Sequence, residues 1–366
     1  MRTVSVKNDS GIALIIVMIV IVVLGILAGG FAYTMKVETT LARHASFSSD
    51  LDWAGRAGVE VSKWILAQST TGPNSQYDSL KQKWAGGPGE TNDPIADIDL
   101  KNYPLLAPDN TVMGTLSIEI KDLDRKFNIN RVAADDAILN QAMTIIGIDA
   151  AQASSIRSSI QTWCDPRGRA TMGGATSDYY EGLPIPYYAK QGPIDDLSEL
   201  LLIKDVTPAM YWGSSGGGSP PVLNRPNPAR KSMFDQPTYA VGMIDLFTPI
   251  SSKLVNINTA SATVLQVFPF IDEHWAQAII SGPGGRAGPD STDGTADDMP
   301  FRSVAELQRV GLPAEVVQQM TPYCTVRSLC FEVHLNVDLR GTRREYVAYL
   351  RRNGPKDIQT LNLHWK

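Results

Sequence analysis

Four aspartates crowd one glycine-containing loop, in the segment GPDSTDGTADDMP at 288–300. They are Asp290, Asp293, Asp297 and Asp298. Carboxylates this close repel one another unless a cation lies among them, and calcium takes about six to eight oxygen ligands from such loops. The spacing differs from the EF-hand pattern, because Asp-x-x-Asp-Gly stands in place of Asp-x-Asp-x-Asp-Gly. The segment therefore predicts either a calcium site or a solvated acidic loop.

The three cysteines, Cys164, Cys324 and Cys330, are too few for a disulfide scaffold and show no zinc-binding spacing. In an oxidising compartment one pair could form and one thiol would remain. Cys324 and Cys330 are close in sequence, which favours a bond between them. Cys164 fits equally well as a buried apolar residue, since its neighbour Trp163 has the character of a core residue. The pairing stays open at the level of sequence.

Motifs for catalysis are missing from the sequence. There is no G-x-S-x-G nucleophile elbow, no Walker loop and no HExxH zinc motif, and the four histidines are scattered. The formal net charge is −5, whereas a general nucleic-acid binder shows a basic surplus. We therefore expect neither an enzyme nor a nucleic-acid-binding protein, and no organic cofactor.

An uncharged apolar run near the N-terminus predicts a membrane anchor. The 24 residues from Ile12 to Met35 carry no charge, and a helix of that length spans about 36 Å, slightly more than a hydrocarbon core. Secretory signals have a shorter apolar core of about 7–15 residues. Arg2 and Lys7 precede the run, so the positive-inside rule places the N-terminus in the cytoplasm and the C-terminal part in the periplasm.

The same helix is expected to continue beyond the membrane. No proline occurs between Gly11 and Pro73, and apolar or small residues recur at steps of three and four. This stripe, the expected contact with partner helices, consists of Leu51, Ala54, Gly58, Val61 and Ile65. We predict a helix of about 55 residues, apolar in its first half and amphipathic in its second.

Strand patterns flank a long region of different character. Residues 111–121, TVMGTLSIEIK, alternate apolar and polar side chains and predict a strand. SLCFEVHLNVDLRGTRREYVAYLRR, near the C-terminus, predicts two strands joined by a turn at Gly341-Thr342. The region between them looks helical and loop-rich, with a flexible break, SGGGSPP, at 215–221. The expected fold class is α+β: a long N-terminal helix packed on an antiparallel sheet, with a large, mainly helical inserted domain.

The short basic leader, the glycine and the uninterrupted apolar helix together resemble a type IV prepilin. The chain is also similar to the minor pseudopilin K family of type II secretion systems, through five segments in that family's order. They are GIALIIVMIVIVVLG (11–25), DLDRKFNINRV (122–132), TWCDP (162–166) followed by GGATSDYY (173–180), LSELLLIKDVTP (197–208) and VNINTASATVLQVFP (255–269). The resemblance implies cleavage by a prepilin peptidase between Gly11 and Ile12, N-methylation of the new terminus, and no enzymatic activity.

The fifth position after the implied cleavage site is Ile16, where pilins carry glutamate. A carboxylate deep in a bilayer costs at least about 2.5–3.5 kcal/mol. Pilins tolerate it because it pairs with the amine of the subunit ahead in the filament. A subunit with none ahead has no such amine, so the apolar residue predicts a place at the tip. The resemblance implies that the chain starts or caps a pseudopilus that exports folded proteins across the outer membrane.

The resemblance also implies partners and ligands. The partners are the minor pseudopilins I and J, the major pseudopilin, the prepilin peptidase, the inner membrane and, more remotely, secreted substrates. Pseudopilins bind calcium as a family, which favours the loop at 288–300. A weaker metal candidate combines Asp165, Asp178 and Glu181, although Arg167 and Thr176 stand where relatives often have carboxylates.

The expected domains follow from the same resemblance. They are a leader at 1–11, a transmembrane half-helix at 12–35, the first portion of a pilin-like α/β part at 36–126, a helical insertion at 127–322 and closing strands at 323–366. Within the insertion, residues 255–320 also resemble a tandem helix-hairpin-helix module.

Two alternatives belong to other classes. One is a minor pilin of a type IV pilus, which neighbouring genes for a retraction ATPase would favour. The other is a membrane-anchored DNA-uptake protein, suggested by the helix-hairpin-helix resemblance. Such modules need a glycine-rich turn at a helix N-terminus to reach phosphate. The turn at 269–273, PFIDE, has a phenylalanine in place of the glycine and two carboxylates where phosphate would lie, so DNA binding is disfavoured.

Overall fold

The structure, a computed structural model, describes residues 10–71, 75–89, 94–107, 109–169, 171–214 and 239–366. Residues 1–9 of the predicted leader and the predicted flexible break at 215–221 lie outside the described residues. The chain divides into two compact units, Met1–Ala57 and Gly58–Lys366.

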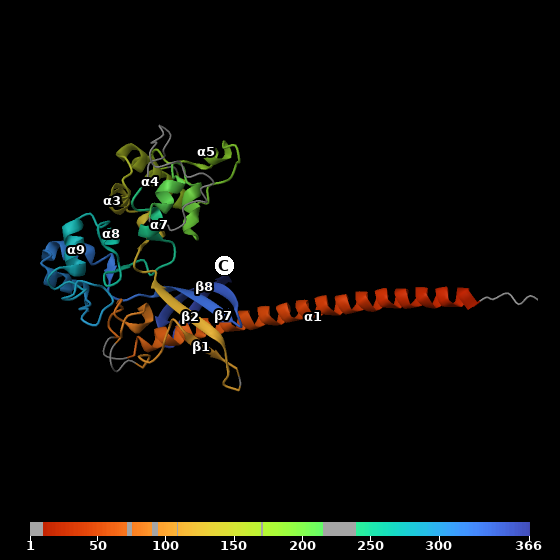
Figure 1. The fold of residues 1–366 in the computed structure, drawn as a ribbon. Helices are drawn as coiled ribbons and strands as arrows, with labels where there is room; N and C mark the ends of the chain where they lie inside the picture. The colour runs from red at the N-terminus through yellow and green to blue at the C-terminus, as the bar shows by residue number, and fades with distance from the viewer. Residues whose placement is uncertain (1–9, 72–74, 90–93, 108, 170, 215–238) are drawn as a thin grey trace, which may run out of the picture. The chain divides into compact units, whose positions relative to one another are not determined.

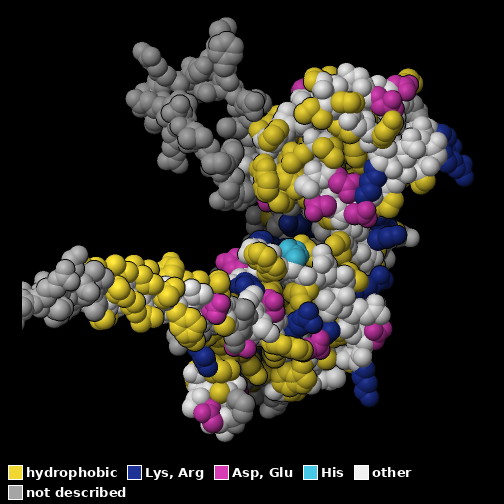
Figure 2. All heavy atoms as spheres, turned by 90° about the vertical axis from the view of Figure 1, so that its right-hand side faces the viewer, with side chains coloured by type: hydrophobic (Ala, Val, Ile, Leu, Met, Phe, Trp, Pro, Cys, Tyr) yellow, Lys and Arg dark blue, Asp and Glu magenta, His cyan; other side chains and the backbone are white. Residues whose placement is uncertain are grey.

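Helix α1 (Ser10–Gln68) is continuous over 59 residues, which confirms the predicted long helix (Figure 1). Its first half carries an unbroken run of exposed apolar side chains from Leu14 to Leu24, visible as a hydrophobic surface in Figure 2. Among the described residues, α1 is the one helix long and apolar enough to cross a membrane. Exposed apolar side chains of this kind are stable in lipid rather than in water.

The second unit is built on a five-stranded antiparallel sheet in the order β1-β2-β7-β8-β9. Its strands are β1 (Tyr103–Leu106), β2 (Val112–Asp122), β7 (Cys330–Leu339), β8 (Thr342–Gly354) and β9 (Asp357–Trp365). The predicted strand at 111–121 and the two closing strands are confirmed. Strands β1 and β9, which form the two edges, were not predicted.

The hairpin between β7 and β8 turns one residue earlier than predicted. Arg340 and Gly341 both have positive φ, at 49° and 83°, and Leu339 pairs with Thr342. A two-residue turn with positive φ at both positions matches the twist of the strands it joins. Thr342 therefore already belongs to the strand.

One face of the sheet is covered by the end of α1 that belongs to the second unit. Gly58 lies so close to the sheet that a Cβ atom there would be 3.1 Å from Leu116 Cδ2 and from Leu335 Cδ1. The 3-10 helix η1 (Lys83–Ala85) adds Trp84, whose ring meets Phe331 edge to face at 5.2 Å. Alternation along β7 supplies the apolar side chains for this core.

A mainly helical domain lies between β2 and β7 in the chain (Figure 1). Its α-helices are α2 (Ile129–Val132), α3 (Asp136–Ile146), α4 (Ala150–Cys164), α5 (Ser177–Glu181), α6 (Pro208–Trp212), α7 (Met243–Leu246), α8 (Ala262–Leu265), α9 (Glu273–Ser281) and α10 (Ala314–Met320). It also contains the 3-10 helices η2 (Leu197–Leu202) and η3 (Val304–Val310). Buried apolar side chains from Phe127 to Cys324 form its hydrophobic core.

Two short parallel strand pairs tie distant segments of this domain together. β3 (Phe127–Asn128) pairs with β4 (Phe247–Thr248), and β5 (Val255–Asn256) pairs with β6 (Cys324–Thr325). Aspartates cap the main helices: Asp135, Asp149 and Asp272 each accept a backbone N–H at the start of α3, α4 and α9. The helices expected between the strands are confirmed, and they are short.

Candidate functional site

The predicted cleavage site lies at the start of α1. Gly11 and Ile12 are in the first helical turn after Ser10, and the exposure of both residues lies outside the description. Ile16 is exposed on the same helix, within the apolar run. Its environment is therefore one in which a carboxylate would be costly without a partner.

The predicted partner stripe is wrong for two positions that belong to the second unit. Gly58 packs against Leu116 and Leu335 of the chain's own sheet, and Ile65 is fully buried. Side chains used inside the chain are not available to another subunit. A periodic apolar pattern identifies a buried helix face, but it does not say which chain covers that face.

The other stripe positions are covered to different degrees. Leu51 is also buried, whereas Ala54 and Val61 are half-buried. Between Leu51 and Ile65, α1 exposes two large apolar side chains, Trp53 and Trp64, at 68% and 44%. These two tryptophans were not singled out from the sequence, because they fall outside the three-four stripe.

The four aspartates of the loop at 288–300 do not converge as predicted. Asp293 is held by Arg286, with Arg286 Nε 3.0 Å from Asp293 Oδ1 and Nη2 2.7 Å from Oδ2. Arg286 is buried and also donates from Nη1 to the carbonyl of Ile257 at 2.6 Å. An arginine side chain, seven residues before Asp293, thus supplies the positive charge that the aspartate cluster needs.

The remaining three carboxylates bond within the loop. Asp290 accepts from the N–H of Thr292 at 2.8 Å, and Asp297 accepts from the N–H of Asp290 at 3.0 Å. Asp298 accepts from the N–H of Gly294 at 2.8 Å and is buried, which raises the pKa of its carboxyl group. Among the described residues, no three histidine, cysteine or acidic side chains are grouped as a metal site.

The weaker carboxylate set is likewise kept apart. Asp165 ends α4, accepts from the N–H of Arg167 at 2.9 Å and pairs with Arg169 at 3.1 Å. The first of these contacts lowers the pKa of Asp165 below its ordinary value. Asp178 and Glu181 lie on the short helix α5. Asp165 is therefore engaged by an arginine rather than by these two carboxylates.

The three cysteines are free, so the predicted Cys324–Cys330 bond is wrong. Cys324 is part of the core of the helical domain, whereas Cys330 is buried at the start of β7 in the sheet. Burial raises the pKa of both thiols, that of Cys330 to about 12. The two cysteines are close in sequence, but between them the chain passes from the core of the helical domain to the sheet, so their thiols are not bonded to each other.

The segment that resembles a helix-hairpin-helix module, residues 255–320, forms short helices. Side chains of the chain itself already make hydrogen bonds at the turns of these helices. Asp272 caps α9 by accepting from the N–H of Trp275 at 2.8 Å, and Glu273 follows it. In the second hairpin Gly311 has φ +90°, and nearby Arg309 donates to the carbonyls of Gly284 and Met299. Carboxylates at one turn and an engaged arginine at the other leave these turns poorly suited to phosphate.

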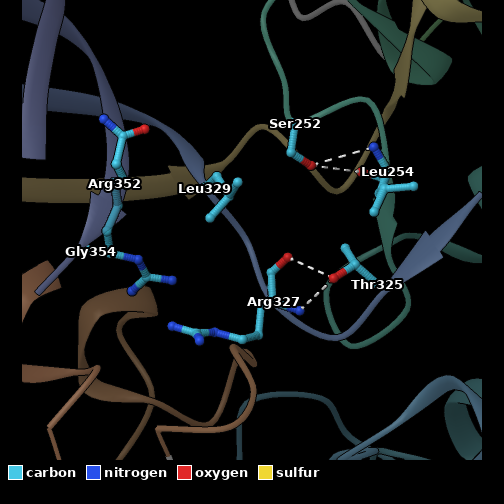
Figure 3. A pocket seen from close by; sticks show the side chains of 8 residues that line it. Ser252, Leu254, Thr325, Arg327, Leu329, Arg352 and Gly354 are labelled. Carbon is cyan, nitrogen blue, oxygen red and sulfur yellow. Dashed lines mark hydrogen bonds between the residues drawn. The ribbon is translucent and has the colours of Figure 1, made fainter.

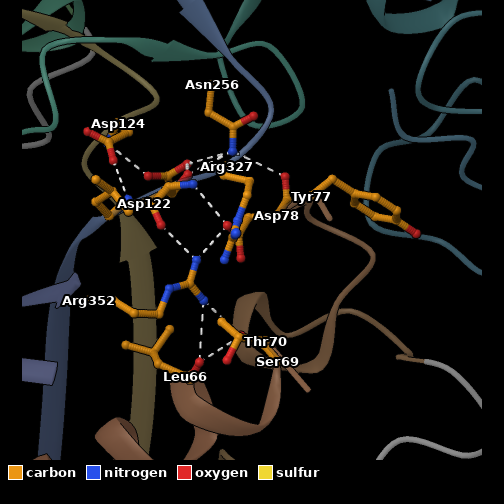
Figure 4. A network of polar contacts seen from close by, with 12 residues as sticks. Leu66, Ser69, Thr70, Tyr77, Asp78, Asp122, Asp124, Asn256, Arg327 and Arg352 are labelled. Carbon is orange, nitrogen blue, oxygen red and sulfur yellow. Dashed lines mark hydrogen bonds and ion pairs between the residues drawn. The ribbon is translucent and has the colours of Figure 1, made fainter. Parts of the chain in front are cut away.

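A polar cluster that the sequence did not reveal lies where the helical domain joins the sheet (Figure 4). We call it the junction cluster; it consists of Asp78, Asp122, Asp124, Asn256, Thr259, Ser328 and Arg352. All seven side chains are buried. They come from the segment after α1, the end of β2, the segment around β5, the segment before β7 and strand β8.

Asp122 is the centre of the junction cluster. Its Oδ2 atom accepts from Thr259 Oγ1 and from Ser328 Oγ, each at 2.5 Å, and from Asn256 Nδ2 at 3.4 Å. Its Oδ1 atom accepts from the N–H of Asp124 at 2.8 Å. One carboxyl group thus joins the sheet to the segment around β5 and to the segment before β7.

Asp124 accepts from three backbone N–H groups. Its Oδ1 accepts from Ser252 at 2.5 Å, and its Oδ2 accepts from Leu329 at 2.6 Å and from Cys330 at 3.1 Å. These bonds hold the point where the chain leaves the sheet next to the point where it returns. Burial raises the pKa of Asp124, and the N–H groups of Leu329, Ser252 and Cys330 oppose that rise.

The single guanidinium of the cluster belongs to Arg352, which pairs with Asp78 at 2.5 Å. Its Nη1 donates to the carbonyl of Leu66 at 3.3 Å and to Ser69 Oγ at 2.9 Å, and its Nη2 donates to the carbonyl of Ser328 at 2.7 Å. The guanidinium lies 4.8 Å from the ring centre of Phe331. A buried charge is tolerated because it is paired and bonded in this way.

An open pocket of about 230 Å³ adjoins the junction cluster (Figure 3). Its lining residues are Ser252, Leu254, Thr325, Arg327, Leu329, Arg352, Asn353 and Gly354. The hydroxyls of Ser252 and Thr325 bond to backbone atoms of the same short turns. The lining offers no nucleophile with an adjacent base, so the pocket does not have the groups of an active site.

Comparisons with known proteins agree with this architecture. Residues 125–212 match the sequence model for protein K of the type II secretion system, over its first domain. The fold matches a chain in the crystal structure of the GspK–GspI–GspJ complex from enterotoxigenic Escherichia coli, with a TM-score of 0.62 and 16% identity. That match covers 89% of this chain and 99% of the other. No curated protein matches the sequence significantly.

The apolar helix α1 fits anchoring in the inner membrane. The matched domain occupies the first part of the helical domain, and the fold match extends over the sheet and the long helix. Residues 125–212 therefore belong to the first domain of type II secretion protein K, and the whole chain has the fold of a chain in the GspK–GspI–GspJ complex.

Proposed function

We propose that the chain is a minor pseudopilin of a type II secretion system and that it occupies the tip of a short pseudopilus, where it starts or caps the filament. The observation that carries the proposal is Ile16, an exposed apolar residue of α1 at the fifth position after the proposed cleavage site. A subunit without an acid there cannot pair with the amine of a subunit ahead of it. The tip is the one place in the filament where that pairing is not needed.

The inserted helical domain supports the same position. It follows β2 and precedes β7, so that a pilin-like sheet carries a second core from Phe127 to Cys324. A subunit with this much additional mass fits poorly among tightly packed neighbours in a shaft. At the end of the filament it meets no such restriction.

The proposed arrangement in the cell follows from α1 and from the matched complex. The N-terminus lies in the cytoplasm and the folded part in the periplasm, because Arg2 and Lys7 precede the apolar run. The partners are minor pseudopilins I and J, which the matched crystal structure contains, together with the major pseudopilin and the prepilin peptidase. The exported substrates would be pushed ahead of the tip.

The test is to locate the chain in assembled pseudopili. The full chain is expressed with pseudopilins I and J and the major pseudopilin, and filaments are labelled with antibodies against the helical domain. We expect label at one end of each filament and co-purification with I and J. Label distributed along the shaft would contradict the tip position. In cells without the chain, fewer filaments would indicate initiation, and longer filaments would indicate capping.

Calcium remains a proposal for the loop at 288–300. Its buried Asp298 carries a raised pKa, which a nearby cation would relieve, whereas Asp293 would have to leave Arg286 to join a site. A ligand at about 100 times its dissociation constant stabilises a fold by about 2.7 kcal/mol. We therefore expect a chelator to lower the melting temperature of the full chain in detergent. An unchanged melting temperature, with and without Asp298→Asn, would exclude calcium there.

A further inference from the structure

The junction cluster contains more acid than base. Three buried carboxylates, those of Asp78, Asp122 and Asp124, are accompanied by the single guanidinium of Arg352. Carboxylates that are buried together cannot all ionise at low cost, so one of them is the natural place for a proton. The question is which carboxyl group holds it.

The hydrogen-bond donors around each carboxyl group decide where the proton lies. Asp124 accepts from three backbone N–H groups, which can only donate and therefore favour its ionised form. Asp78 pairs with Arg352 and accepts from the N–H of Ser328, two groups that can only donate. Oδ2 of Asp122 meets the hydroxyls of Thr259 and Ser328, which can donate or accept. The shared proton therefore belongs on Oδ2 of Asp122.

Charged and titratable groups lie around Asp122 on several elements of the chain. Asp124 follows the end of β2, Asp78 follows α1, Arg352 is on β8, and Cys330 begins β7. The segment around β5 contributes only the neutral groups of Asn256 and Thr259. The partner of Arg352 is Asp78, so Asp122 has no cation bonded to it among the described residues.

The consequence for titration is a raised pKa. Burial raises the pKa of Asp122 to about 7; the Asp124 and Asp78 carboxylates add to this, while the hydroxyls of Ser328 and Thr259 oppose it. In an unfolded or detached segment the same group would titrate near its ordinary value of about 4. A raised pKa means that the stabilising effect is complete at low pH and is lost as the pH rises towards 7.

We propose that Asp122 is a proton-operated lock on the attachment of the helical domain to the sheet. In its neutral form it binds Thr259 and Ser328 and closes the junction. Ionisation places a second uncompensated charge beside Asp124 and loosens the segment around β5. The pseudopilin head would thus respond to the pH of the compartment in which the filament grows.

Hydrogen exchange on the full chain in detergent tests the lock. The reporting amides are Asn256, which donates to the carbonyl of Asp124, and Ile257, which donates to the carbonyl of Thr325. We expect their protection, corrected for the intrinsic pH dependence of exchange, to fall about tenfold between pH 6 and pH 8, because opening ionises a group with a pKa near 7. The variant Asp122→Asn, neutral at every pH, should lose this dependence.

The matched control is Asp97→Asn, which changes an exposed aspartate in the same unit and should keep the wild-type pH dependence. If Asp122→Asn does not fold, infrared spectroscopy of the wild-type protein decides instead, through the carboxyl band of a protonated buried acid at pH 6 that disappears at pH 8. Protection independent of pH, or unchanged pH dependence in Asp122→Asn, would overturn the proposal. So would the absence of that band.

Discussion

Replacing Arg352 with methionine is expected to lower the free energy of unfolding by about 3–5 kcal/mol, because Asp78 would stay buried without its partner. The two side chains are exposed by only 1% and 2%, and Arg352 also satisfies the carbonyls of Leu66 and Ser328. Methionine keeps an unbranched apolar stem, so the packing on Phe331 changes little. Urea unfolding of the full chain in detergent, followed by circular dichroism, measures the loss.

The chain supplies a matched control next to this residue. Arg351 precedes Arg352 on β8 and is exposed, so Arg351→Met should change stability by no more than about 0.5 kcal/mol. Asp78→Asn combined with Arg352→Met should recover part of the loss, because it removes the buried charge. Equal effects of Arg351→Met and Arg352→Met would show that the buried pair does not stabilise the junction.

Replacing Gly11 with leucine is expected to leave the leader attached and to abolish secretion. The proposed cut lies between Gly11 and Ile12, and a side chain at the first of these would block the close approach that a peptidase needs there. N-terminal sequencing of the native chain should begin at Ile12 when the prepilin peptidase is present. The variant should begin at Met1.

Gly25→Leu provides the control for this experiment. Gly25 lies further along the same exposed helix, and a Cβ atom there would have no neighbour within 4 Å. This variant should therefore be cut and should support secretion. An intact Met1 in the native protein, in the presence of the peptidase, would contradict the proposed processing and leave only a membrane-anchored domain.

Patterns of apolar residues along the sequence correctly predicted the long helix and the central strands of the sheet. The proline-free apolar run predicted α1, and alternation predicted β2 and β7, because side-chain periods of 3.6 and 2 follow from backbone geometry alone. Strand β9 was missed because most of its residues are exposed and its pattern does not separate two faces. Its place at the edge depends on pairing with β8.

The candidate sites depend on which side chains meet in the folded chain, and the sequence was less informative about those contacts. The aspartates at 288–300 predicted a cation, yet Arg286 pairs with one of them, and nothing in a spacing pattern shows that pairing. The junction cluster joins Arg352 to Asp78 across 274 positions of sequence. Asp122 and Asp124 lie two residues apart at the end of a predicted strand, which is the one sequence signal that could have drawn attention to them.

The inserted domain leaves the sheet and returns to it at neighbouring points. Asp122, the last residue of β2, is paired with Phe331 of β7, and Asp124 holds the backbone of Leu329 and Cys330. The pairing of β2 with β7 therefore continues up to the point where the chain leaves the sheet. In evolutionary terms, the insertion can therefore change in sequence without breaking the pairing of β2 with β7, provided that the residues that bond to Asp122 and Asp124 are kept.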